Sequence, residues 1–249
     1  MVGSIVIPAY NREDTIDRTI GSLSDRGLVR DTGAWEIVVV DDASTDGTKK
    51  RISYWENKYP KLVIGIKLPE HQERVVALQS GIHYSRGEWI VMLDSDDELA
   101  GHFFKAFTDA LHLYPQAEII NWGSLFHWFN KETKRYERTS ILETYHPPVK
   151  EDGTIGVFRA GGVTSGAFAF KKSLLLERGY IPTAHNPFTL GEKFLKMYPE
   201  IVPLYNPGQT DLGNPWGQDF MWAYHLSRGM AVEKWVSLNQ ILHFKHQRT

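Results

Sequence analysis

The chain of 249 residues carries a formal net charge of -2 and has a sequence pI near 6.6, so it lacks the overall positive field that attracts nucleic acid. A nucleic-acid partner is therefore not expected, although a local basic patch would still permit one. The chain contains no cysteine, which excludes disulfide bonds and thiolate chemistry, and none of its apolar runs approaches the roughly 20 residues that a membrane helix needs.

The amino terminus enters a strand pattern at once and lacks the basic start and long apolar stretch of a secretory signal. Since the absence of cysteine also fits a reducing compartment, we expect a cytoplasmic location.

Residues 1–122 alternate short apolar runs with helical patterns, an order typical of parallel strands joined by crossover helices. In chain order, strands are expected at residues 5–7, 35–40, 62–66, 89–93 and 119–122. The helices expected between them begin at Asn11 and Ser44 and cover residues 74–84 and 103–111. Asp14 lies three positions after Asn11, which is a plausible capping arrangement.

After residue 123 the periodicity is weaker. The expected elements are a hairpin of 125–129 and 136–142, a strand within 163–170, a helix over 219–226 and a strand at 241–244. The stretch 182–215 is rich in proline, glycine and asparagine, which favours a functional loop or lid. We therefore expect one α/β domain over residues 1–249, with a mostly parallel sheet between helices and a mixed part after residue 123.

An acidic cluster follows the apolar strand Trp89 to Leu93. Asp94, Asp96 and Asp97 stand at the carboxyl end of that strand, where α/β sheets bind their ligands. Crowded carboxylates repel each other unless a cation joins them. Hard oxygen ligands suit Mg²⁺ or Mn²⁺, which typically keeps waters and takes substrate phosphates as further ligands. The cluster therefore predicts a site for a metal ion and a diphosphate.

A second acidic pair, Asp41 and Asp42, ends the strand at residues 35–40. A carboxylate accepts hydrogen bonds from ribose hydroxyls or from the imide N–H of uracil. The alternative for Asp42 is a cap of the following helix.

Other phosphate-binding patterns fit less well. The first strand is followed by Pro8 to Asn11 and not by a glycine-rich turn, so the dinucleotide-binding fingerprint and the P-loop are both missing. Asp94 to Asp96 would also suit a phosphatase with an aspartyl nucleophile. That family usually has threonine or valine at the position of Glu98, which disfavours the phosphatase interpretation.

Four blocks, residues 4–11, 39–48, 74–82 and 87–97, together resemble the family-two glycosyltransferases of GT-A fold. The resemblance implies a Rossmann-like, mostly parallel sheet flanked by helices, a nucleotide-diphosphate sugar as donor, and inversion at the anomeric carbon. It implies donor-binding roles for Pro8, Ala9, Tyr10, Asp42, Arg74, Asp94 and Ser95. Among these, Asp42 would meet the base, and Arg74 would lie near the base or the phosphates. Asp96 would bind the metal.

The second half resembles the family less closely. Residues 161–166 resemble an acceptor-side loop, which implies acceptor contacts for Gly162, Thr164 and Ser165. Residues 217–220 resemble the segment that supplies the catalytic base, here Asp219. Its alternative is a plain acid near a helix N-terminus.

Two further candidates remain. In enzymes of the family that the chain resembles, a late histidine can complete the metal shell. His246, near the end of the chain, is a candidate metal ligand whose alternative is a solvated histidine, and Lys245 or Arg248 would equally suit the diphosphate. Trp216 is a candidate for stacking on the acceptor sugar.

Together these features predict a glycosyltransferase that depends on Mn²⁺ or Mg²⁺ and moves a sugar from a UDP- or GDP-sugar to an acceptor hydroxyl, in glycan or polysaccharide synthesis. Residues 1–122 would bind the donor and residues 123–249 the acceptor. Two alternatives stay open: a sugar nucleotidyltransferase, and a non-catalytic nucleotide-sugar-binding protein of the same fold.

Overall fold

The computed structural model describes residues 1–24, 33–130, 132–133, 135–156, 166–183, 187–200 and 215–248. Within these ranges, no helix combines the length and the apolar character that crossing a membrane requires.

Four parallel strands form the first part of the sheet, in the order β3-β2-β1-β4. Their bounds are β1 Gly3–Ala9, β2 Trp35–Asp41, β3 Val63–Lys67 and β4 Trp89–Met92. All seven residues of β1 and all seven of β2 are buried, because helices cover both faces of this parallel sheet. The structure confirms the expected parallel sheet.

The second part of the sheet is mixed, as predicted. It continues from β4 through β8 Phe168–Lys171, β6 Ile119–Asn130, β9 Trp235–Arg248 and the short β5 Glu98–Leu99, with β7 Arg135–Leu142 beside β6. β8 is antiparallel to both β4 and β6, whereas β9 is parallel to β6. β5 pairs Glu98 with Phe244 of β9, so the last strand runs beside the acidic cluster that follows β4.

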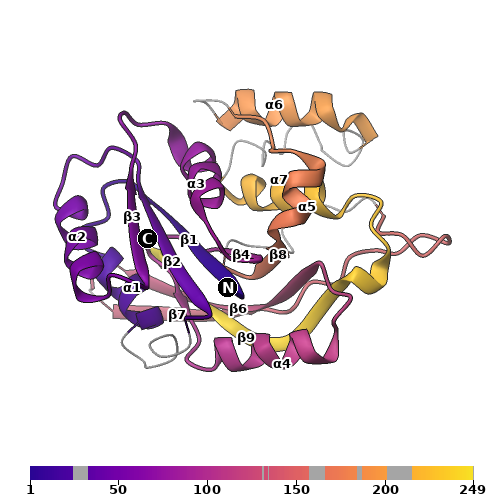
Figure 1. Cartoon of the computed structure of the whole chain (residues 1–249), viewed down its shortest axis with the longest axis horizontal. Coiled ribbons are helices and arrows are strands. Elements are labelled where there is room, and N and C mark those ends of the chain that lie inside the picture. The colour runs from indigo at the N-terminus through magenta and orange to yellow at the C-terminus, as the bar shows by residue number, and fades with distance from the viewer. Residues whose placement is uncertain are drawn as a thin grey trace.

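Helices pack on both faces of the sheet, as Figure 1 shows. One face carries α1 Ile16–Ser24, α2 Thr48–Lys58 and α4 Phe103–Leu113. The other face carries α3 Glu73–Tyr84, α5 Lys172–Arg178 and α7 Pro215–Ser227, with α6 Pro187–Met197 packed beside α7. A short 3₁₀ helix, Val232–Lys234, leads into β9. Strand β1 contributes to both cores, with Ile5 and Ile7 on one face and Val6 on the other.

Several expectations about the bounds of elements are wrong. Helix α2 begins at Thr48 and not at Ser44, whose hydroxyl instead accepts the backbone N–H of Asn11 at 3.0 Å. The strands expected at 119–122 and 125–129 are one continuous strand, β6. Helix α1 begins at Ile16 and not at Asn11, because Asn11 has a φ of 51° and its side-chain oxygen accepts the N–H of Thr45 at 2.9 Å. Helix α6 occupies part of the stretch expected to be a loop, since it buries Phe194 against Tyr198 and Tyr224.

Strand β9 is much longer than the expected strand at 241–244, because it pairs with β6 over most of its length. Within the stretch 163–170, β8 begins at Phe168, and residues 163–165 lie outside the described residues.

Gly87 is a position where the packing of β1 tolerates no side chain. A Cβ added there would lie 2.3 Å from the carbonyl carbon of Gly3 and 2.5 Å from the backbone nitrogen of Ser4. Because both neighbours are backbone atoms of a buried strand, we expect Gly87→Ala to lower the free energy of unfolding by about 3 kcal/mol, measured by urea denaturation. The matched control is Gly101→Ala, whose Cβ would meet no atom within 4 Å. Equal urea midpoints for the two variants would contradict this packing.

A buried histidine makes the packing of α7 sensitive to acid. His225 accepts a hydrogen bond at Nδ1 from the Tyr198 hydroxyl and donates from Nε2 to the carbonyl of Gly179 at 2.7 Å. Burial, followed by the charge of Arg178, lowers the pKa of His225 below its ordinary 6.5. As the pH falls, His225 therefore takes up a proton more readily in the unfolded chain than in the folded protein. Its contribution to stability is present above about pH 6.5 and is lost as the pH falls.

We expect the free energy of unfolding to decrease between about pH 7.5 and about pH 5.5, as measured by urea denaturation. The control is His225→Gln, which keeps a donor and an acceptor but does not titrate, and its decrease should be smaller. The same decrease in both proteins would contradict the assignment.

Candidate functional site

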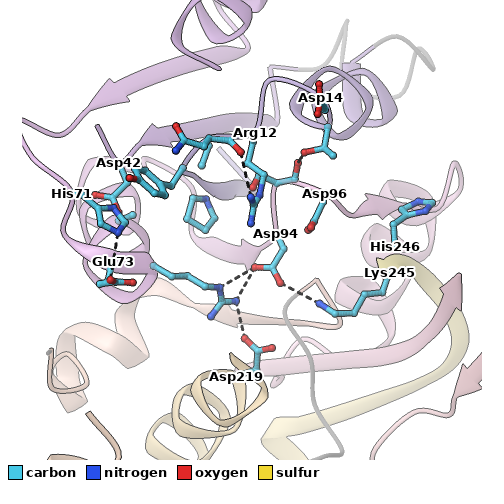
Figure 2. A pocket seen from close by; sticks show the side chains of 18 residues that line it. Arg12, Asp14, Asp42, His71, Glu73, Asp94, Asp96, Asp219, Lys245 and His246 are labelled. Carbon is cyan, nitrogen blue, oxygen red and sulfur yellow. Dashed lines mark hydrogen bonds and ion pairs between the residues drawn. The ribbon is translucent and has the colours of Figure 1, made fainter. Parts of the chain in front are cut away.

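A cavity of about 660 Å³ opens at the carboxyl ends of β1, β2 and β4 (Figure 2). Its walls come from the loops after these strands, the start of α3, helix α7 and the end of β9. This is the edge where parallel α/β sheets bind ligands.

The structure brings ten of the predicted site residues into this one cavity. They are Pro8, Ala9, Tyr10, Asp42, Arg74, Asp94, Ser95, Asp96, Asp219 and His246. The acceptor candidates are different, because Gly162, Thr164 and Ser165 lie outside the described residues. Trp216 lies in the first turn of α7, and its side chain is also outside the described part of the chain.

Several residues of the cavity were not predicted from the sequence. These are Asn11, Arg12, Asp14, Thr15, His71, Glu73 and Ala77, and they join Lys245, which was an alternative for the diphosphate. Most of them directly follow the Pro8 to Tyr10 segment or directly precede Arg74. Adjacency in the chain was therefore the signal that would have found them.

Arg74 joins the two sides of the cavity. Its Nε donates to Oδ1 of Asp94 at 2.9 Å, and its Nη2 donates to Oδ1 of Asp219 at 2.8 Å. Its Nη1 also donates to the side-chain oxygen of Gln218 at 3.1 Å. Burial alone would lower the pKa of Arg74, but the charges of Asp94 and Asp219 raise it overall. The guanidinium is thus a permanent positive charge with a fixed orientation, which suits the binding of phosphate oxygens.

Two carboxylates of the acidic cluster are held by cations. The ammonium of Lys245 donates to Oδ2 of Asp94 and to Oδ2 of Asp97, both at 3.2 Å. Burial would raise the pKa of Asp94, but the charges of Arg74 and Lys245 lower it well below its usual range. Burial would likewise raise the pKa of Asp97, but the charge of Lys245 and the hydrogen bond with His243 lower it overall. Both groups are therefore carboxylates in the folded protein.

Asp96 is the exception in the cluster. Among the described residues, no hydrogen bond or ion pair reaches its carboxylate. Burial, followed by the charges of Asp97 and Asp94, raises its pKa. A divalent cation beside it would relieve this unfavourable charge, so the oxygen donors at Asp96 fit Mg²⁺ or Mn²⁺.

The candidate metal ligand His246 also faces the cavity, but one of its ring nitrogens has a partner. Nε2 lies 2.9 Å from Oε1 of Glu98, and the backbone N–H donates to Oδ1 of Asp97 at 3.0 Å. Within the described ranges, no group of three or more histidine and acidic side chains is arranged to hold a metal. A metal at Asp96 would thus rely on substrate phosphates and water for most of its ligands.

The opposite end of the cavity is built around Asp42. Its Oδ1 accepts the backbone N–H of Gln72 at 2.8 Å. The carboxylate therefore does not cap the following helix, which was the alternative interpretation. Nδ1 of His71 lies 2.8 Å from Oδ2, and this buried oxygen accepts no hydrogen bond from the described residues. The His71 ring stacks on Tyr10, with ring centroids 3.9 Å apart. A carboxylate next to an aromatic platform suits a flat ring that carries an N–H.

Backbone strain is concentrated at this edge of the sheet. Within the described part of the chain, the non-glycine residues with positive φ are Asn11, Ala43 and Glu73, at 51°, 57° and 73°. Asn11 and Glu73 line the cavity, and Ala43 follows Asp42. Each such residue costs on the order of 1–3 kcal/mol, and strain of this kind collects at functional sites.

Comparison with known proteins gives consistent results. A model of the family described as Glycosyl transferase family 2 matches residues 4–178. The dolichyl-phosphate beta-glucosyltransferase ALG5A of Trichomonas vaginalis is 35% identical over 97 residues, which are 37% of this chain and 30% of that protein. The chain thus spans less than a third of the length of this relative.

Two solved structures resemble the fold over most or nearly all of the chain. S. aureus TarS 1-349 in complex with UDP gives a TM-score of 0.61 at 18% identity, covering 99% of this chain and 60% of that one. The mannosyltransferase PcManGT from Pyrobaculum calidifontis, in complex with GDP-Man and Mn²⁺, gives 0.52 at 20% identity, covering 78% of this chain and 51% of that one. These similarities confirm the expected GT-A type of fold.

Proposed function

This chain belongs to glycosyl transferase family 2, and from that premise we propose that it moves a sugar from a nucleotide-diphosphate donor to an acceptor hydroxyl with inversion. The reaction is a single displacement, in which the acceptor oxygen attacks the anomeric carbon as the diphosphate leaves. The observation that carries the proposal is the position of Arg74, which contacts Asp94 on the donor side and Asp219 on helix α7.

The donor would lie along the carboxyl edge of the sheet. Its base would stack near Tyr10 and donate an N–H to the buried Oδ2 of Asp42. Uracil and guanine both present such an N–H, whereas cytosine presents an unprotonated nitrogen at the same place. Thymine presents the same N–H as uracil, so the choice of a UDP- or GDP-sugar as the proposed donor is supported by the UDP bound by TarS and the GDP-Man bound by PcManGT.

The diphosphate would be neutralised by two kinds of positive charge. Arg74 and Lys245 supply positively charged side chains in the cavity. A Mn²⁺ or Mg²⁺ ion held by Asp96, when bound, would offset the charge that develops on the leaving diphosphate. His246 stays a candidate second ligand, and that role would require its contact with Glu98 to break for Nε2 to bind.

Asp219 is the proposed general base. It is buried, faces the cavity from α7, and is the fifth residue of that helix, which places it beyond the first turn where an acid mainly serves the helix dipole. Arg74 holds its Oδ1, which orients the carboxylate. A base on the side opposite the diphosphate is needed to deprotonate a hydroxyl, whereas a phosphate acceptor is already ionised. We therefore infer a hydroxyl acceptor on a glycan or polysaccharide, with Gly162, Thr164, Ser165 and Trp216 as the proposed acceptor contacts.

A transfer assay tests this proposal. The protein is incubated with UDP-glucose, UDP-GlcNAc or GDP-mannose, in Mn²⁺ or in EDTA, with and without a mixture of glycoside acceptors, and the released UDP or GDP is measured. We expect release with one donor that needs both the metal and an acceptor. No release above the protein-free blank for any donor would favour a non-catalytic binding protein, and release of pyrophosphate from sugar phosphate and nucleoside triphosphate would favour a nucleotidyltransferase.

A further inference from the structure

Lys245 lies between the carboxylates of Asp94 and Asp97, each of which has a second hydrogen-bond partner that holds it in place. Asp94 is also held by Arg74, and Asp97 is also held by Nε2 of His243 at 3.1 Å. The side chain of Asp97 is only 1% exposed, and that of Lys245 is 14% exposed. The lysine therefore bridges two carboxylates from the wall of the cavity. Figure 2 shows its contact with Asp94.

Charge is unevenly distributed around this lysine. Arg12, Asp14, Asp42 and Glu73 also line the cavity, and the charge of Arg12 acts on Asp96. The acidic cluster and helix α7 together place four carboxylates, those of Asp94, Asp96, Asp97 and Asp219, around the cations Arg74 and Lys245. Both cations lie on Asp94, and none of the ion pairs among the described residues reaches Asp96. The burial of the ammonium disfavours its charge, but Asp97 and Asp94 raise the pKa of Lys245 overall, so it stays positive. In the free protein, the lysine thus holds two carboxylates beside Asp96, the one at which a divalent cation would gain most.

We propose that Lys245 acts as an exchangeable internal cation, which holds Asp94 and Asp97 in the free protein and moves its ammonium to the donor diphosphate when donor and metal bind. This inference rests on the proposed function. The lysine side chain is a compact charge on a flexible four-carbon stem, so it can exchange one anionic oxygen for another by rotation alone. Arg74 cannot do the same, because three of its nitrogens are fixed to three side chains.

The exchange couples metal binding to nucleotide binding. Without nucleotide, the ammonium of Lys245 repels a divalent ion from Asp94 and Asp96. With nucleotide, Lys245 transfers to the diphosphate, and Oδ2 of Asp94 becomes available to face the metal. Each ligand should therefore strengthen the binding of the other, because both favour the same position of the lysine.

Removing the charge of Lys245 should change the two affinities in opposite directions. Lys245→Met is expected to bind Mn²⁺ alone about tenfold more tightly than the unaltered protein, and to bind UDP or GDP in saturating Mn²⁺ about tenfold more weakly. Lys245→Gln should behave like Lys245→Met, and Lys245→Arg, which keeps the charge, should keep the weak binding of Mn²⁺ alone. The matched control is Lys105→Met, at an exposed lysine on α4 that pairs only locally with Asp109.

Free Mn²⁺ is measured by electron paramagnetic resonance without nucleotide, and nucleotide binding is measured by calorimetry, after circular dichroism has shown that each variant is folded. If Lys245→Met and Lys245→Gln bind Mn²⁺ alone no more tightly than Lys105→Met, or lose no nucleotide affinity, the exchange is contradicted while the proposed function stands. If the unaltered protein binds neither nucleotide nor Mn²⁺ under any condition, both the exchange and the proposed function are overturned.

Discussion

Asp219→Asn is expected to lower kcat about 10³-fold while it leaves the affinity for the donor nearly unchanged. The amide removes the proton acceptor but keeps an oxygen that can accept the hydrogen bond of Arg74, which is now 2.8 Å from Oδ1 of Asp219. The geometry around the diphosphate is therefore preserved, and only the deprotonation of the acceptor is lost. The measurement is steady-state transfer with varied donor, which separates kcat from KM.

The neighbouring residue supplies a matched control for this variant. Gln218→Ala removes another hydrogen bond to Arg74, at 3.1 Å, without removing a base. We expect it to retain transfer within about tenfold of the unaltered protein. If Asp219→Asn retains more than a tenth of the transfer rate, or if Gln218→Ala loses as much as Asp219→Asn, the proton acceptor is another group and Asp219 serves to position Arg74.

Asp96→Asn should separate stability from ligand binding. The raised pKa of Asp96 means that its charged form is disfavoured in the folded protein, so at neutral pH this carboxylate opposes folding. Replacing it with the uncharged amide should therefore raise the melting temperature of the metal-free protein. The same change should abolish the stabilisation by Mn²⁺ and nucleotide, which amounts to about 2.7 kcal/mol when the ligands are present at 100 times Kd.

Thermal unfolding with and without Mn²⁺ and UDP or GDP measures both effects. Asp14→Asn is the matched control, since Asp14 is an exposed acid that lines the same cavity. It should keep the ligand-dependent increase in melting temperature. An increase of the usual size in Asp96→Asn would show that the metal binds elsewhere.

The gathering of the candidate donor-binding residues at one edge of the sheet could be predicted because it depends on local pattern. Asp42, Asp94 and Asp96 each follow an apolar strand, and parallel strands bring their carboxyl ends to one edge of a sheet. This rule places such residues near each other without knowledge of any long-range contact. The position of Arg74 at this edge could be predicted in a similar way, since Arg74 lies in the first turn of a crossover helix that begins there.

Contacts between distant segments were beyond prediction. Lys245 and His246 reach Asp94 and Glu98 because β9 pairs with β5 in one particular register, and neither strand has a pattern that fixes this pairing. The contact between Arg74 and Asp219 spans 145 positions of the chain and depends on the packing of α7.

Local exceptions were missed for a different reason. Helix α6 contains Gly191, and glycine weakens a helical pattern in the sequence. The helix became recognisable only in the structure, where Phe194 is buried. The site role of Glu73 depends on a positive φ that glutamate rarely adopts, so no sequence rule indicates it.

The most direct test of the proposed donor site is calorimetric titration of UDP and of GDP into the unaltered protein, in Mn²⁺ and in EDTA. The geometry of Asp42, Arg74, Asp96 and Lys245 predicts that one of the two nucleotides binds in Mn²⁺ with a Kd of roughly 1 μM, about -8 kcal/mol, and that EDTA abolishes the binding. Binding of neither nucleotide, with or without the metal, would contradict the assignment of this cavity to a nucleotide-sugar donor.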